Sequence, residues 1–178
     1  GEVQPDYYEI QYNPYAVGGD HSVLITRRYK SYAKLDTVGT RGQPGTEMLS
    51  GLITLVEKPL SWILNHYPLL APFLIEQSLN AQVDEGYNNI SYKIFNIGIV
   101  NYTDAMAIEV GVDLQQTVEV VERAFAIANQ FRQEGIVHSA PASIRFVKAS
   151  DAMIAMQQGR PTMMLEIIIV KGVNRYMD

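Results

Sequence analysis

The chain has 178 residues, of which 47 % are apolar and 19 % charged, so it is long enough to form a hydrophobic core and too apolar to be disordered. Its formal net charge of −5 argues against a general nucleic-acid-binding protein, which needs a basic surface to neutralise phosphates. The sequence contains no cysteine, which excludes disulfides, thiolate metal sites and cysteine nucleophiles.

The N-terminal part predicts an antiparallel hairpin. Residues 7–12 are rich in tyrosine and isoleucine, which is typical of a strand, and residues 21–29 predict a second strand. Turn-forming residues occur between them, at Asn13-Pro14-Tyr15 and again at Gly18-Gly19-Asp20. We therefore expect a long loop between the two strands.

Three short helices are predicted next, over residues 46–57, from Pro59 to residue 67, and from Pro68 to about residue 79. Charged residues and prolines interrupt this apolar region, which lacks the roughly 20 apolar residues of a membrane span. Three interpretations stay open for it: core helices that cover a sheet, a lid, or a surface for peripheral membrane contact, with Trp62 and Tyr67 at the lipid interface.

The C-terminal half predicts four more strands and two helices. The strands are expected at residues 91–99, 105–113, 142–148 and 163–170, and the last, which is apolar on both faces, should be central. A helix should begin at Asp113 and end near residue 133, with a buried stripe at Val118, Val121, Phe125, Ala128 and Phe131. A short helix is predicted from Ser150 to Met156. The fold class is α+β, a single domain with a mostly antiparallel sheet and helices packed on it.

Several motifs with known chemistry are missing. The chain has no Gly-x-Gly-x-x-Gly, no His-Glu-x-x-His and no Gly-x-Ser-x-Gly. The three histidines, His21, His66 and His138, are far apart and do not share a ligand spacing. We therefore predict neither a metal site nor a self-contained hydrolase.

Arg145 is the most informative residue. Strand alternation places Ser143, Arg145 and Val147 on one face of the sheet, where an arginine between hydrophobic residues needs a partner. One interpretation is a structural ion pair with Glu109 or Glu166 on a neighbouring strand. The other is an arginine that binds an oxygen-rich substrate.

A family resemblance adds to this. The segment Pro-Ala-Ser-Ile-Arg-Phe-Val-Lys-Ala-Ser-Asp-Ala at residues 141–152, followed by Gly159-Arg160 and by Leu-Glu-Ile at 165–167, resembles the substrate-binding (cap) domain of FAD-linked sugar-lactone and alditol oxidases, in the vanillyl-alcohol oxidase superfamily. The tyrosine-rich first strand and Ala-Ile-Glu-Val at 107–110 are similar to family segments in the same order. The similarity is weak between residues 31 and 88.

The resemblance implies a substrate-binding role for four residues. Arg145 matches the arginine of the family's Glu-x-Arg pair, which projects toward substrate and flavin, and Ser143 stands where the family has the glutamate. Arg160 matches the arginine of an Arg-Asp turn, with Pro161 in place of the aspartate. Ile168 falls where alditol oxidases have a pocket threonine, which implies a less polar pocket and an apolar or lipid-like substrate as one hypothesis.

The resemblance also implies partners. FAD would be bound mainly by another domain of the same polypeptide, and residues 1–178 would be the substrate-binding domain of a larger flavoprotein that oxidises an alcohol or lactone. The chain would be inactive without the FAD domain, and its location would be cytoplasmic or at a membrane surface. The alternative function is a non-catalytic ligand-binding or dimerisation module.

Overall fold

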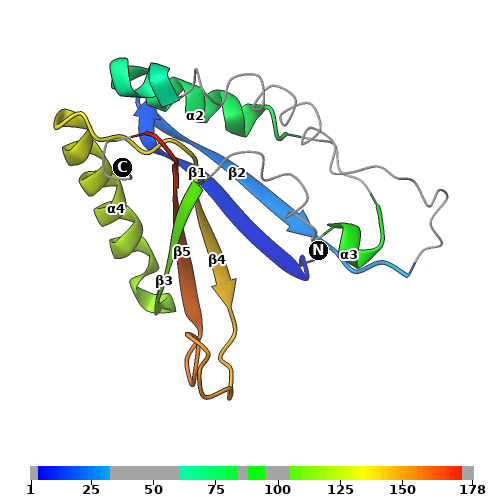
Figure 1. Ribbon diagram of the computed structural model, residues 1–178. Helices are drawn as coiled ribbons and strands as arrows, with labels where there is room; N and C mark the ends of the chain where they lie inside the picture. The colour runs from blue at the N-terminus through cyan, green and yellow to red at the C-terminus, as the bar shows by residue number, and fades with distance from the viewer. Residues whose placement is uncertain (1–3, 33–60, 84–87, 95–104, 174–178) are drawn as a thin grey trace.

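The computed structural model describes residues 4–32, 61–83, 88–94 and 105–173 (Figure 1). The predicted helix over residues 46–57 lies outside these residues. Five strands form one sheet: β1 (Tyr7–Val17), β2 (Asp20–Arg28), β3 (Ala105–Asp113), β4 (Ala142–Val147) and β5 (Thr162–Val170). The helical elements are residues 61–66, η1 (Pro68–Leu70), α2 (Ala71–Asn80), α3 (Ser91–Ile94), η3 (Leu114–Gln116) and α4 (Thr117–Gln133).

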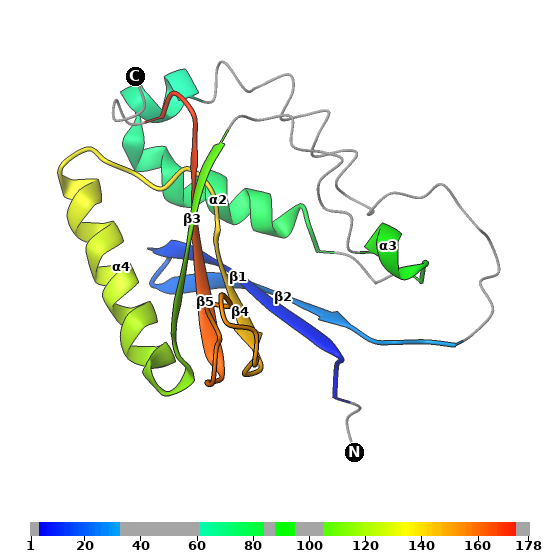
Figure 2. The same ribbon diagram turned by 60° about the horizontal axis from the view of Figure 1, so that its bottom comes forward.

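The sheet confirms the predicted fold class. Its strand order is β2-β1-β4-β5-β3, and every neighbouring pair is antiparallel. As predicted from its two apolar faces, β5 is an interior strand, between β4 and β3. Helix α4 lies along one face of the sheet, and α2 crosses near one end of the strands (Figure 2).

The prediction of a long loop between the first two strands is wrong. Residues 13–15 belong to β1, where the register with β2 shifts between Tyr12 and Ala16. Such a bulge accommodates Pro14, which cannot donate a ladder hydrogen bond. The chain reverses instead at Gly18 and Gly19, whose φ angles of 66° and 103° suit a two-residue hairpin turn.

Two other local predictions are also wrong. Residues 91–94 form the short helix α3 rather than the start of a strand, and the rest of that predicted strand, residues 95–104, lies outside the described part. Residues 150–156 form turns rather than a helix. The Ser150 hydroxyl accepts a hydrogen bond from the Ala152 N–H at 3.2 Å, and Ser150 pairs with Gln158 across the loop, so local bonds replace the helical ones.

Helix α4 largely follows its sequence signals. The Asp113 carboxylate accepts a hydrogen bond from the Gln115 N–H at 2.9 Å and caps η3, from which α4 continues. Gly135, at a φ of 82°, follows the helix end. The predicted buried stripe needs two corrections, because Val118 and Phe131 are exposed. The helix packs on the sheet through Val120, Val121, Ala124 and Phe125.

The register divides the sheet into two different faces. The face beneath α4 is apolar, with Tyr12, Ile144, Met163 and Leu165 buried in one cluster. We call the opposite face the polar face, because it carries the following side chains: Glu9, Gln11, Arg28, Glu109, Ser143, Arg145 and Glu166. Alternation along the strands thus places the core-forming side chains of the α4 cluster on one face and these polar side chains on the other.

A second core lies at the end of the sheet where α2 packs. Tyr15, Ile75, Leu79 and Val137 are buried together there, so α2 is a core helix. The Tyr15 hydroxyl accepts a hydrogen bond from the backbone N–H of His138 at 2.7 Å, which joins β1 to the segment after α4. No helix within the described ranges is long and apolar enough to cross a membrane.

Replacing Asn13 with alanine should lower the free energy of unfolding by about 1–3 kcal/mol. The buried Asn13 amide donates to the Pro72 carbonyl at 2.8 Å, and its oxygen accepts from the Tyr15 N–H at 3.1 Å. The substitution leaves both buried groups without these bonds. Urea unfolding measures the loss, and the exposed Asn80→Ala is the control, expected to change little. Equal effects of the two substitutions would contradict this role of Asn13.

Alkaline pH should destabilise the fold through Tyr12. Burial raises the pKa of Tyr12 to about 12, whereas an unfolded tyrosine titrates near about 10. As the pH rises, the Tyr12 hydroxyl loses its proton first in the unfolded chain. The stability that the buried, neutral Tyr12 contributes is therefore complete below about pH 10 and is lost as the pH rises through about 12. The expected loss is about 1.4 kcal/mol at about pH 11. Urea unfolding between about pH 9 and 11 measures it, and Tyr12→Phe should show a shallower decline; equal slopes would contradict the assignment.

Candidate functional site

The polar face gathers side chains from neighbouring strands into two rows. In one row, Gln11 pairs with Ser143, Ser143 with Glu166, and Glu166 with Glu109, which crosses β1, β4, β5 and β3. In the next row, Glu9 pairs with Arg145 and Arg145 with Met164. Interior strands usually carry apolar side chains, so this concentration of polar groups calls for a functional explanation.

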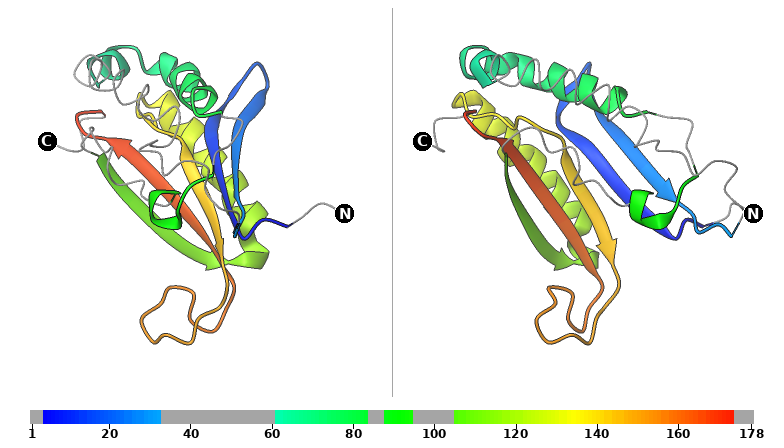
Figure 3. Two further views of the ribbon diagram at one scale, coloured as in Figure 1. Left: turned by 90° about the vertical axis from the view of Figure 1, so that its right-hand side faces the viewer. Right: turned by 45° about the vertical axis from the view of Figure 1, so that its right-hand side comes forward.

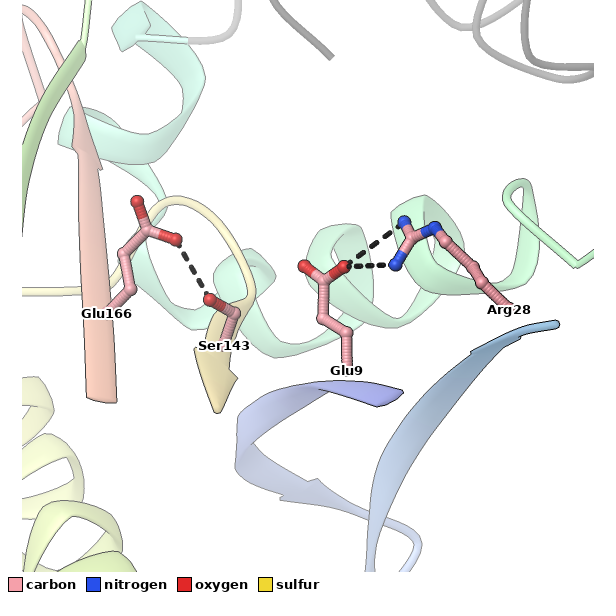
Figure 4. Close-up of polar contacts among 4 residues, drawn as sticks. All are labelled: Glu9, Arg28, Ser143 and Glu166. Atoms are coloured by element: carbon pink, nitrogen blue, oxygen red, sulfur yellow. Dashed lines mark hydrogen bonds and ion pairs between the residues drawn. The ribbon is translucent and has the colours of Figure 1, made fainter. Parts of the chain in front are cut away.

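Two polar contacts hold the central side chains in place. The buried Ser143 hydroxyl donates to Glu166 Oε2 at 2.9 Å, and Arg28 contacts Glu9 Oε2 through Nη1 at 3.2 Å and Nη2 at 3.3 Å. Figure 4 shows these four side chains standing on the same side of their strands, with the Ser143–Glu166 pair beside the Glu9–Arg28 pair. The carboxylates are therefore oriented by neighbours within the sheet.

Arg145 forms an ion pair with Glu109, which reaches it across β5. The hydrogen bond to Glu109 raises the pKa of Arg145, and the negative charges of Glu109, Glu166 and Glu9 act in the same direction. The side chain is 51 % exposed, so the guanidinium is not buried. The structural ion pair foreseen from the sequence is present, and part of the guanidinium also faces solvent.

Gln11 is the unsatisfied member of the first row. Its Oε1 atom is buried and has no hydrogen-bond partner among the described residues. A buried amide oxygen without a partner is costly. Gln11 can therefore accept a hydrogen bond from a hydroxyl group placed on this face beside Ser143.

The structure brings together three of the four residues singled out from the sequence. Ser143 and Arg145 share the polar face, and Ile168 lies on the same face, two residues beyond Glu166 on β5. Arg160 is separate: it is exposed in the loop of residues 148–161, which extends beyond the sheet (orange in Figure 3).

Glu9 and Gln11 also belong to this face, although the sequence patterns did not single them out. Both occur at alternate positions of the predicted first strand, so the signal was present. What the sequence does not show is the pairing of β1 with β4, which aligns Gln11 with Ser143 and Glu9 with Arg145.

Comparison with known proteins identifies the family. The chain matches the family model of D-arabinono-1,4-lactone oxidase over residues 13–178, which includes every strand from β2 to β5 and the last part of β1. It belongs to the D-arabinono-1,4-lactone oxidase family. No curated protein and no solved structure gives a significant match to the chain.

The family assignment makes this a lactone oxidase-related domain, and the polar face carries side chains that can bind a polar ligand. Its carboxylates and Gln11 accept hydrogen bonds, while Ser143 and the guanidinium groups donate them. This set suits a neutral ligand with several hydroxyl or carbonyl oxygens. Among the residues that the structure describes, no three potential metal-ligating side chains come together.

Proposed function

We propose that this chain is the substrate-binding domain of an FAD-dependent oxidoreductase that oxidises an alcohol or lactone. The polar face binds and orients the substrate. FAD is bound mainly by another domain of the same polypeptide, which faces this side of the sheet. The chain alone then has no oxidase activity.

The observation that carries this proposal is the segregation of the two faces. The face beneath α4 supplies a conventional apolar core, whereas the polar face collects Gln11, Ser143, Arg145 and Glu166 on adjacent strands. Since a polar surface of this kind adds little to folding, its arrangement favours ligand binding. The match to a lactone oxidase family supports an alcohol or lactone as the ligand.

The described residues do not form a cradle for the FAD pyrophosphate. Dinucleotide sites use glycines between a strand and a helix N-terminus. Here the glycines with positive φ lie at the hairpin turn, after α4, in the β4–β5 loop and after β5. Flavins supply hydride transfer, and the role proposed for this chain is to bind the substrate and hold its reacting carbon in position.

The substrate proposed here has an oxygen-rich part and an apolar part. Oxygen atoms would contact Arg145, Ser143 and Gln11. Ile168 pairs with Ala107 at the neighbouring position, so this end of the face is apolar. Because Ser143 stands where the family has a glutamate, the face lacks that carboxylate and suits a substrate less polar than a polyol.

The visible absorption spectrum of the polypeptide that contains this domain tests the proposal. Purified without added cofactor, it should show flavin bands, and a lactone or alcohol substrate added in the absence of oxygen should reduce the flavin and bleach them. A folded product that stays colourless after FAD is added would overturn the proposal and favour a ligand-binding or dimerisation module.

Peripheral membrane contact is a second, separate proposal. Exposed aromatic and aliphatic side chains gather at residues 61–66, η1 and the start of α2, and they include Trp62, Tyr67, Leu69 and Phe73. Aromatic residues with polar tips suit the lipid interface. The chain should co-sediment with vesicles, and the double substitution of Trp62 and Leu69 by serine should abolish this. Failure of the wild type to sediment would overturn the proposal.

A further inference from the structure

A cavity of about 200 Å³ lies between α4 and the sheet, on the face opposite the polar face. Most of its walls are apolar and come from α4, β1 and β5, with Val120, Ala124, Leu165 and Ile167 among them. Arg123 and Ile127 line it and are also exposed, so the cavity opens to solvent beside α4. This position separates it from the substrate site proposed above.

Three polar groups line this otherwise apolar cavity. His138 Nδ1 is buried without a hydrogen-bond partner among the described residues. Burial lowers the pKa of His138, so its ring is neutral and can donate or accept according to its tautomer. The Tyr12 hydroxyl is a second group, and Arg123 has no ion pair or hydrogen bond within the described residues.

We propose that this cavity binds a small apolar ring that carries a carboxylate. The ring would lie between Ala124 and Leu165, and the carboxylate would lie at the mouth, beside Arg123. An apolar cavity of about 150 Å³ is known to hold a benzene molecule. The larger volume here leaves space for one polar substituent near His138 and Tyr12.

The charge of the lining decides between a carboxylate and an amine. Arg123 is the only charged side chain among the residues that line the cavity within the described part. A cationic ligand would meet a like charge at the mouth, whereas a carboxylate would form a charge-assisted hydrogen bond. Apolar pockets with a few convergent polar groups are the usual form of small-molecule sites.

Benzoate is the probe, with toluene and benzylamine as its neutral and cationic counterparts. Titration of the 178-residue chain, followed by NMR, should shift the methyl resonances of Val120, Leu165 and Ile167. The expected dissociation constant of so small a ligand is about 1 mM. Toluene should bind in the same place, and benzylamine should bind at least about threefold more weakly than benzoate.

Two matched pairs of variants locate the site. Ala124→Leu fills the cavity and should weaken benzoate binding at least about tenfold, whereas Ala126→Leu, on the exposed side of α4, should not change it. Arg123→Gln should bind benzoate about threefold more weakly than the wild type does, and its affinity for toluene should not change. The control for charge is Arg27→Gln, an exposed arginine on β2.

Three results would overturn the proposal. They are the absence of saturable shifts up to about 10 mM benzoate, equal effects of the two alanine substitutions, or benzylamine binding as tightly as benzoate. If Ala124→Leu fails to fold, Arg123→Gln still tests the ligand charge, because that side chain is exposed.

Discussion

Replacing Arg145 with alanine should lower the turnover of the proposed flavoprotein by at least about a hundredfold. The guanidinium stands among Ser143, Glu166 and Glu109 on the polar face and is half exposed, so it can donate to a substrate oxygen. Loss of a charged donor that orients the substrate affects the reacting geometry strongly. The free energy of unfolding should fall by less than about 1 kcal/mol, because partly exposed ion pairs contribute little.

The effect of Arg145→Ala on turnover, compared with its effect on stability, decides whether Arg145 binds the substrate or only forms a structural ion pair. Steady-state kinetics and urea unfolding are measured on the same preparation, with Arg27→Ala on the opposite face as the control. Glu109→Gln removes the ion pair but keeps the guanidinium, and most of the turnover should survive. If Arg145→Ala is less stable and fully active, the arginine serves only the Glu109 ion pair.

Replacing Tyr15 with alanine should lower the free energy of unfolding by about 3–5 kcal/mol, which can unfold a domain of this size. Tyr15 is 0 % exposed and packs in the core with Ile75, Leu79 and Val137. Its ring also lies 5.5 Å from the guanidinium of Arg132. Truncation leaves a large cavity where β1, α2 and the segment after α4 meet.

Tyr15→Phe separates the hydroxyl from the ring. It keeps the packing and removes the acceptor of the His138 N–H, so it should cost about 1–3 kcal/mol. Tyr32→Ala, at a fully exposed tyrosine, is the control and should change stability by less than about 0.5 kcal/mol. Urea unfolding measures all three variants. A Tyr15→Ala variant as stable as Tyr32→Ala would contradict the packing described here.

Much of the fold follows from local sequence patterns. Alternation in residues 105–113 and the two apolar faces of residues 163–170 predicted β3 and β5 with nearly correct bounds. The cap at Asp113 and the glycine at residue 135 fixed the position of α4. These features depend on neighbours within one element, which a single sequence displays.

The errors have a different origin. The residues 13–15 look like a turn, but the buried Asn13 makes its hydrogen bond to Pro72, fifty-nine residues away. Alternation along residues 142–148 predicted that Ser143 and Arg145 lie on the opposite face of the sheet from Ile144, and the strand register confirms this. The neighbours that the sequence did not indicate, Glu9 and Gln11, depend on the pairing of β1 with β4, which local patterns do not encode.

We propose that the flavin domain and the substrate cover the polar face. These 178 residues contain no cysteine, so within this domain a single introduced cysteine reports one position. Ala107 and Ile108 are adjacent and exposed on β3 and point to opposite faces, the first to the polar face beside Ile168. They are therefore a matched pair.

The decisive measurement is the rate of thiol labelling of Ala107→Cys and Ile108→Cys, in this chain and in the complete polypeptide. Both cysteines should react quickly in the chain alone. In the complete polypeptide we expect Ala107→Cys to react at least about tenfold more slowly, and more slowly still with substrate bound, while Ile108→Cys is unchanged. Protection of Ile108→Cys instead, or equal labelling of both, would contradict the account.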